Sequence, residues 1–291
     1  MVLRKRLKNK LANVISPEAL NKIFSSFDII GNIVIIKIPS SGLQDASEIA
    51  KQIMHTHKNV KSVFLQKSPV KDDFRVRELI LLAGENKTIT NHKENGCVFS
   101  VDVKNCYFSP RLSFERSRIA NKVLPNEKVV NMFSGVGCFS ILIAKKVHSA
   151  IVYSIDINPI AYNFMQDNVK LNGVYGRVFP LLGDSKKLVL TNLQGLADRV
   201  LMLLPEKALE YLPSALSALK KEGGWIHYYD FQHASKGENP LEKTQKKVAD
   251  TLDNLGVFYV FSSSRIVRPI GPNWYQTVLD ININESPSKF L

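Results

Sequence analysis

The chain has 291 residues, of which 39 are Lys or Arg and 26 are Asp or Glu, and its formal net charge is +13. Hydrophobic residues make up 45% of it, which is typical of a folded globular protein and excludes extended disorder. No apolar run approaches the roughly 18 residues that a membrane-spanning helix needs, and the first residues lack the apolar core of a secretory signal. We therefore expect a soluble, cytoplasmic protein without a membrane partner. Its charge favours a polyanionic partner.

Basic residues are concentrated in the first part of the chain. Residues 1–120 hold 20 Lys or Arg against 11 Asp or Glu, whereas the remainder holds 19 against 15. Within residues 1–26, leucines recur at helical spacing between basic side chains over residues 3–15, which predicts a basic amphipathic helix. Three interpretations stay open for this helix: a solvated helix packed on its own domain, an RNA-contacting helix, and an organelle transit segment.

The next segment, residues 27–108, alternates strand-like runs with one helical stretch. The runs cover 32–38, 60–65 and 97–103, and the helical stretch covers 46–55. This pattern predicts a small α+β domain, which we expect to contact RNA. Residues 109–127 are expected to form a basic helical connector.

Regular alternation of strands and helices begins at residue 128. Strands are expected at 128–133, 150–156, 178–182, 199–203 and 225–229, and helices at 138–147, 159–171, 206–220 and 240–254. Two further β-rich runs, 257–267 and 274–283, are separated by a turn-prone Arg-Pro-Ile-Gly-Pro linker. Residues 128–291 are therefore predicted to form a mostly parallel, seven-stranded, Rossmann-like sheet that ends in an antiparallel hairpin, which is the class I methyltransferase architecture.

Three cysteines occur, Cys97, Cys106 and Cys138, without any C-x-x-C pair. An odd number without such pairing argues against a disulfide framework and against a structural zinc. We expect reduced thiols and no metal.

A candidate cofactor site lies at the ends of the first three strands of the rear sheet. The first strand leads into a glycine turn, the second ends in an acidic residue that can accept from ribose hydroxyls, and the third ends in an Asp that can accept from an adenine amino group. A bare strand-to-helix turn is the alternative, and the absence of G-x-G-x-x-G makes a dinucleotide a poor fit. The pattern favours S-adenosylmethionine, held by Phe133, Ser134, Gly135, Val136, Gly137, Asp156, Ile157, Gly183 and Asp184.

Several motifs in sequence order carry a resemblance to a known family. They are the runs 73–79, 83–86, 92–96, 107–112 and 115–116 in the front part, then 131–137, 156–159, 227–229 and 265–267. Together they resemble the archaeal and eukaryotic tRNA (guanine-N1)-methyltransferases, which act on the guanosine 3′ of the anticodon, tRNA position 37. The resemblance covers roughly residues 27–283. It implies a monomeric enzyme that uses S-adenosylmethionine and contacts the anticodon arm of tRNA. An elbow-binding N-terminal domain common in the family is expected to be missing.

The resemblance also implies roles for individual residues. Glu115 matches the general base that removes the guanine N1 proton, and Arg75 matches the arginine that stabilises the guanine. The alternatives are a helix-surface Glu115 paired with Arg111 or Arg118, and an Arg75 paired with Asp72 or Asp73. Contacts with RNA are expected from Arg111, Tyr107, Arg77 and Arg116.

One departure from the family pattern lies at the end of the fourth strand of the rear sheet. The substrate pocket is expected there, at Leu203 and Pro205. The family usually has Asn-Leu-Pro at this place, and Leu203 stands where the Asn is expected. The amide that would hydrogen-bond guanine is thus replaced by an apolar side chain. Three alternatives follow: a wybutosine-pathway enzyme that transfers an aminocarboxypropyl group to a tricyclic guanosine derivative, one that methylates such a derivative, and a catalytically silent tRNA-binding factor.

Overall fold

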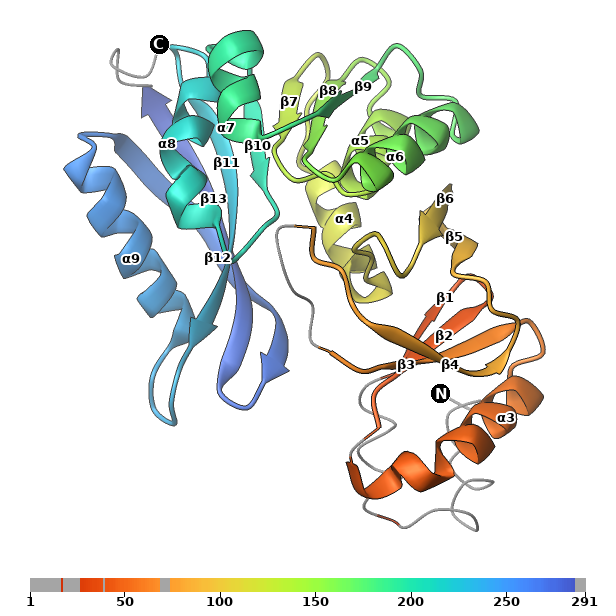
Figure 1. Cartoon of the computed structure of the whole chain (residues 1–291). Coiled ribbons are helices and arrows are strands. Elements are labelled where there is room, and N and C mark those ends of the chain that lie inside the picture. The colour runs from red at the N-terminus through yellow and green to blue at the C-terminus, as the bar shows by residue number, and fades with distance from the viewer. Residues whose placement is uncertain (1–16, 18–26, 39, 69–73, 286–291) are drawn as a thin grey trace. The chain divides into compact units, whose positions relative to one another are not determined.

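The structure is a computed structural model that describes Pro17 and residues 27–38, 40–68 and 74–285 (Figure 1). The basic helix expected within residues 1–26 therefore lies outside the described residues, apart from Pro17. The chain divides into two compact units, a front unit (Met1–Ser113) and a rear unit (Phe114–Leu291), and each is described by itself.

The front unit is built on a four-stranded sheet in the order β1 (Asp28–Ile30), β2 (Ile33–Ile36), β3 (Ser62–Gln66), β4 (Leu79–Gly84). β2 and β3 are parallel, and the crossover between them runs through η1 (Ser40–Asp45) and α3 (Ala46–Thr56), whereas the outer pairs are antiparallel. α3 forms here because Ile49, Ala50 and Ile53 recur at helical spacing and are fully buried in the front core. A separate hairpin, β5 (Ile89–Glu94) with β6 (Cys97–Asp102), completes the α+β unit.

A short helical segment links the two units. η2 (Pro110–Leu112) has proline in its first turn and leads into α4 (Ser113–Ala120), which begins at the last residue of the front unit. Proline suits a first turn because its missing N–H has no partner there in any case.

The rear unit contains a seven-stranded sheet in the order β12-β13-β11-β10-β7-β8-β9. The parallel strands are β7 (Lys128–Asn131), β8 (Ile151–Asp156), β9 (Val178–Leu182), β10 (Arg199–Met202) and β11 (Gly224–His233). β13 (Trp274–Glu285) runs antiparallel to β11 and to β12 (Phe258–Gly271). The predicted mostly parallel sheet with an antiparallel hairpin is confirmed.

Helices cover this sheet, as Figure 1 shows. α8 (Ala208–Ala218) and α9 (Pro240–Asn254) share the main core with β10, β11 and β13, while α5 (Cys138–Lys146) and α6 (Pro159–Leu171) contact β8 and β9. Between β9 and β10 lie α7 (Ser185–Leu188) and the π-helical turn η3 (Val189–Leu193). The strand order reverses between β7 and β10, and the carboxyl ends of strands at such a point are where open α/β sheets bind ligands.

The hairpin linker differs from its prediction. The Arg-Pro-Ile-Gly part of Arg-Pro-Ile-Gly-Pro belongs to β12 itself, and the turn is confined to Pro272 and Asn273, where Asn273 has φ +58°. β12 accommodates Pro269 because its register against β13 shifts on both sides of that residue, and such bulges tolerate a residue that cannot donate. The prediction was wrong because turn-prone composition does not reveal pairing with a partner strand.

Cys97, Cys106 and Cys138 are all buried, and each is a free thiol in this structure. Among the described residues, no helix is long and apolar enough to cross a lipid bilayer.

Candidate active site

The glycine turn lies between β7 and α5. Gly135 and Gly137 both adopt positive φ, +56° and +90°. A Cβ on Gly137 would lie 3.0 Å from side-chain carbons of both Ile141 and Met165, so the tight turn requires glycine there. Asn131 fixes the entrance to the turn, because its amide donates to Ser140 Oγ at 3.0 Å. Residues 133–137 are thus held with their backbone close to the switch point of the sheet.

Asp156 joins the end of β8 to this turn. Its Oδ2 accepts from the Gly135 N–H at 2.6 Å, and its Oδ1 accepts from the Asn158 N–H at 2.9 Å. Burial raises the pKa of Asp156, and these two hydrogen bonds oppose that rise. Both oxygens keep further acceptor capacity, so the carboxylate can also receive the hydroxyls of a ribose.

The end of β9 provides a second acidic residue. Asp184 caps α7 by accepting from Lys186 N–H at 2.7 Å, and its other oxygen accepts from Tyr211 OH at 3.1 Å. Two exposed apolar side chains flank these acids along the chain: Ile157 follows Asp156, and Leu182 lies two residues before Asp184. Carboxylates beside apolar surface at adjacent strand ends fit the ribose, the adenine amino group and the adenine ring of S-adenosylmethionine.

Glu115 is buried in the interior of the rear unit, with 1% of its surface exposed. Tyr229 OH donates to its Oε1 at 2.7 Å, and Arg118 Nε donates to the same oxygen at 2.7 Å. Arg265 donates to Oε2. The alternative of a solvated helix-surface glutamate is therefore wrong, although the expected pairing with Arg118 is present.

A chain of buried polar contacts extends from Arg118 through the sheet. Arg118 donates to both oxygens of Asp280 on β13, at 2.6 Å and 3.2 Å, and Ser263 Oγ donates to Asp280 at 2.6 Å. His227 Nδ1 lies 2.6 Å from Asp280 Oδ1, and its Nε2 lies 2.7 Å from Arg199 Nη1. Because a guanidinium only donates, Nε2 must accept and Nδ1 must carry the proton. His227 is thus the neutral link between Asp280 and Arg199, which is itself paired with Glu127 at 2.7 Å.

The pKa shifts along this chain have clear causes. Burial lowers the pKa of His227 and outweighs the opposing effect of Asp280. Burial would raise the pKa of Asp280, but hydrogen bonds from His227, Arg118 and Ser263 hold it well below its usual range. Burial and the nearby Glu115 raise the pKa of Tyr229 well above its usual range, so the phenol stays a donor. Tyr229 and Arg118 therefore both donate to Glu115 Oε1.

The other oxygen of Glu115 faces a more accessible partner. The Arg265 side chain is 33% exposed, compared with 13% for Arg118, and its guanidinium lies 5.1 Å from the ring centre of the exposed Phe114. Oε2 is thus the oxygen that an incoming group can reach by displacing one partly solvated side chain.

The predicted arginines of the front unit differ in what holds their side chains: an aromatic ring for Arg75, and hydrogen-bond acceptors for Arg77 and Arg111. Arg75 has a left-handed backbone, φ +52°, and its guanidinium stacks 4.1 Å from the ring centre of Tyr107. A positive φ is costly for arginine, and such strain clusters at functional sites. Arg77, in contrast, is buried and donates to the Phe108 carbonyl at 3.0 Å. Arg111 Nε donates to Asp28 at 2.6 Å.

The remaining predictions concern Arg75, Arg77 and Arg116. The suggested partners of Arg75, Asp72 and Asp73, lie outside the described residues. Arg116 of the rear unit is 3% exposed, and its guanidinium lies 5.9 Å from the Phe139 ring centre. RNA contacts by Arg77 and Arg116 remain predictions, and both side chains are buried in this conformation.

The expected substrate pocket residues follow β10 directly. Leu203 is half-buried one residue beyond the strand, and Pro205 is buried. Position 203 therefore presents an apolar side chain where the family pattern has an amide.

Sequence reasoning assigned no role to Tyr229, Arg265 or Asp280. Tyr229 and Arg265 lie within motifs that carried the family resemblance, so the signal for them existed. Asp280 could be found only from its contacts, since it is 162 residues from Arg118 in sequence.

Comparisons with known proteins identify relatives of this chain. Residues 90–255 match the TRM5/TYW2 methyltransferase domain, and residues 7–88 match the TYW2 N-terminal domain. The chain is 40% identical to tRNA (guanine(37)-N(1))-methyltransferase Trm5b of Pyrococcus abyssi, covering 92% of this chain and 78% of that protein. It is 39% identical to tRNA 4-demethylwyosine(37)-methyltransferase Taw21 of Saccharolobus solfataricus, covering 90% and 95%.

The fold of the chain also superimposes on solved structures. A complex of aTrm5 with tRNALeu superimposes with a TM-score of 0.83 at 36% identity, covering 96% of this chain and 78% of that chain. Pyrococcus horikoshii TYW2 in complex with MeSAdo superimposes with a TM-score of 0.78 at 25% identity, covering 97% and 100%.

Proposed function

Because the chain belongs to the TRM5/TYW2 methyltransferase family, we propose that it methylates N1 of the guanosine at position 37 of tRNA. It is an S-adenosylmethionine-dependent tRNA methyltransferase. Within that class, we assign the anticodon arm as the part of tRNA that it contacts, and we propose that it acts as a monomer.

The observation that carries the proposal is the buried, ionically held carboxylate of Glu115. Guanine N1 bears a proton, so its lone pair becomes available for attack only when a base removes that proton. Arg118 and Tyr229 occupy Oε1 and fix the carboxylate, while Oε2 faces the partly exposed Arg265. We assign Oε2 as the atom that takes the N1 proton. S-adenosylmethionine supplies the electrophilic methyl group when it is bound.

Arg75 is proposed to stabilise the guanine as it loses this proton. Negative charge then develops towards O6, and a guanidinium stays charged and presents fixed donors. The contact with the Tyr107 ring supports this assignment, because it pre-orders a long side chain that would otherwise lose rotamer freedom on binding.

A second candidate function is methylation of a tricyclic guanosine derivative at the same tRNA position. Leu203 favours it, because an apolar side chain suits a larger and less polar base better than guanine. A 4-demethylwyosine methyltransferase is also among the relatives described above. Aminocarboxypropyl transfer needs no base to activate the ring in this way, so a held Glu115 favours methylation.

The non-enzymatic alternative, a catalytically silent tRNA-binding factor, does not fit the site. A silent site has no need of the buried carboxylate of Glu115, whose retention with three donors argues for chemistry. The glycine turn and Asp156 also retain the geometry of a cofactor site.

Mass spectrometry of tRNA nucleosides tests these functions together. The enzyme and S-adenosylmethionine are incubated separately with an unmodified tRNA transcript that has guanosine at position 37 and with tRNA that carries 4-demethylwyosine there. We expect 1-methylguanosine from the first substrate, and replacement of that guanosine by adenosine should abolish it. Methylation of the tricyclic substrate alone, aminocarboxypropyl transfer or no product would each refute the main proposal.

A further inference from the structure

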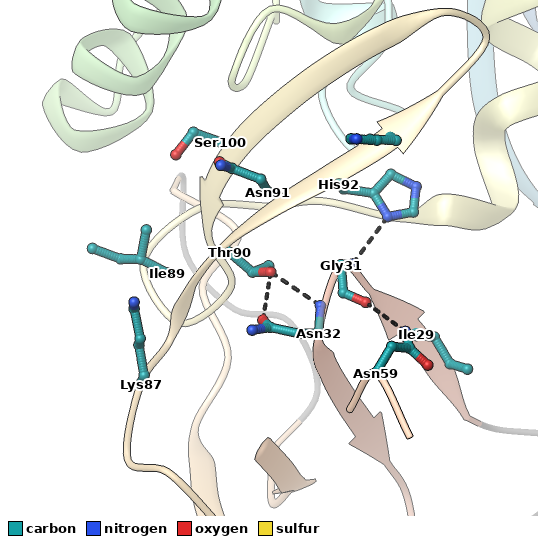
Figure 2. Close-up of a pocket in the computed structure, with 11 residues that line it drawn as sticks. Ile29, Gly31, Asn32, Asn59, Lys87, Ile89, Thr90, Asn91, His92 and Ser100 are labelled. Atoms are coloured by element: carbon teal, nitrogen blue, oxygen red, sulfur yellow. Dashed lines mark hydrogen bonds between the residues drawn. The ribbon is translucent and has the colours of Figure 1, made fainter. Parts of the chain in front are cut away.

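A second concave site lies wholly within the front unit, and its lining includes none of the residues assigned to catalysis. It has a volume of about 730 Å³ and lies between the β1–β2 turn and strand β5 (Figure 2). Pockets of roughly 300–1,000 Å³ are the size that binds small molecules and cofactors. This volume is large enough for a nucleotide and much larger than a single inorganic anion requires.

The lining of this pocket is cationic and rich in amides. It includes Lys87 and Lys93 but no Asp or Glu, and the amides of Asn32, Asn59 and Asn91 are also present. Both lysines are exposed, and neither forms an ion pair with another described residue. A pocket with two unpaired ammonium groups and no carboxylate attracts an anion.

Side-chain hydrogen bonds hold the two walls of the pocket together. The Gly31 N–H donates to His92 Nδ1 at 3.1 Å, and the Asn32 N–H donates to Thr90 Oγ1 at 3.1 Å. Thr90 Oγ1 in turn donates to the Asn32 carboxamide oxygen at 2.7 Å. Figure 2 shows these bonds bridging the β1–β2 turn to β5. The pocket is therefore formed before any ligand binds.

Gly31 allows the two walls to approach this closely. Its φ is +55°, and a Cβ added there would lie 2.2 Å from Thr90 Oγ1 and 2.5 Å from the Asn91 carbonyl oxygen. Any larger residue would force the turn away from β5. The narrow junction is thus a built feature of the front unit.

The exposed groups of the lining match the parts of an RNA nucleotide. Lys87 and Lys93 can neutralise phosphate, while Asn59 and Asn91 are exposed amides that both donate and accept, as base edges and 2′-hydroxyls require. Ile89, on the same strand, has a 45% exposed apolar side chain against which a base can lie.

We propose that this pocket, between the β1–β2 turn and β5, binds an unstacked nucleotide of the tRNA substrate other than the methylated guanosine, with its phosphate held by Lys87 and Lys93. The inference rests on tRNA as the substrate and extends it by a second point of contact. Such a contact adds affinity and fixes the position of the RNA on the front unit, and it carries no chemistry of its own.

The test measures binding of an unmodified tRNA transcript to the full chain at several salt concentrations. Lys87→Gln/Lys93→Gln removes two charges from the pocket, and Lys51→Gln/Lys104→Gln removes two exposed charges elsewhere in the same unit. Loss of the contact with this one phosphate lowers the salt slope of log affinity by about 0.7 for single-stranded RNA. We expect that change and at least tenfold weaker binding for the pocket variant, with less than threefold weakening for the control.

An isosteric substitution of an asparagine gives a second, independent test of tRNA binding by the pocket. Asn91→Asp places a carboxylate in the pocket, and Asn254→Asp adds the same charge at an exposed position of the rear unit. We expect tenfold weaker binding only for Asn91→Asp. Melting temperatures and S-adenosylmethionine affinity, measured for every variant, identify any loss that comes from unfolding.

Equal effects of the pocket and control variants would overturn the proposal, because binding would then follow total charge alone. Unchanged tRNA binding in the pocket variants would also overturn it, including the case in which the pocket serves a protein partner. Failure of the methylation proposal is distinguishable: the nucleoside assay would then lack 1-methylguanosine, whereas the difference in salt slope between pocket and control variants would persist.

Discussion

Asp280 is the residue on which the position of Glu115 depends, and replacing it with Asn tests that dependence. Asp280 is 1% exposed and accepts hydrogen bonds from Arg118, His227 and Ser263. Asn keeps the shape, but it loses the charge and turns an NH₂ group towards these donors. Removing one partner of a buried ion pair costs about 3–5 kcal/mol, because the other charge is left buried.

The expected loss is large enough to measure directly. One kcal/mol shifts the melting temperature by about 2–4 °C in chains of 150–250 residues, so Asp280→Asn should melt roughly 6–20 °C lower than the wild type. Because Arg118 loses its anchor, Glu115 loses one of its fixed donors. We therefore expect single-turnover methyl transfer, measured below the melting transition of the variant, to slow by at least tenfold while S-adenosylmethionine affinity stays within twofold.

Asp230 provides a matched control on the neighbouring strand β11. It is 4% exposed, but burial raises its pKa, and its partner Lys247 is partly solvated. Neutralising a carboxylate whose charged form is already disfavoured costs little, so Asp230→Asn should lose about 1 kcal/mol or less. An Asp280→Asn variant that melts within 2 °C of the wild type, or no lower than Asp230→Asn, would show that Asp280 does not hold a buried charge in place.

Three further predictions concern the same unit. His227 has a lowered pKa, so as pH falls the unfolded chain takes up a proton at this residue before the folded chain does. The free energy of unfolding should therefore decrease as pH drops below about 6.5, by up to about 1.4 kcal/mol per pH unit. Urea unfolding of His227→Gln should lack this part of the pH dependence. A variant with the wild-type slope would contradict the assignment. Asp156→Ala removes the acceptor of the Gly135 N–H and of the ribose, so calorimetry should find S-adenosylmethionine at least tenfold weaker, and equal affinity would exclude the ribose contact. Leu203→Asn should raise kcat/KM for guanosine relative to 4-demethylwyosine by about 5–150-fold, the equivalent of 1–3 kcal/mol, and an unchanged ratio would show that position 203 does not select the base.

The sheet and helices of the rear unit were predictable because their signals are local. α6 and α9 are found at the predicted residues 159–171 and 240–254. Each has an Asn cap and a proline in its first turn, which are local signals of a helix start. The β12–β13 turn was misplaced because a bulge depends on the partner strand, which composition does not reveal.

The cofactor turn was equally visible, since its glycines and Asp156 lie within 21 residues of one another. The hydrogen bonds that hold Glu115 were not visible in the sequence. Its partners Tyr229 and Arg265 are 114 and 150 residues away, and whether Glu115 is solvated or buried depends on how α4 packs against β11 and β12. Spacing alone favoured an exposed glutamate for that reason.

The central claim is that Glu115 removes the N1 proton, and single-turnover formation of 1-methylguanosine by Glu115→Gln tests it most directly. Gln keeps the size and one acceptor oxygen but cannot take a proton, and such a base contributes about 10²–10⁴ in rate. The account predicts at least a 100-fold slower reaction with S-adenosylmethionine affinity within twofold of the wild type, and partial recovery of the rate in Glu115→Asp. A Glu115→Gln enzyme that forms 1-methylguanosine within threefold of the wild-type rate would contradict it.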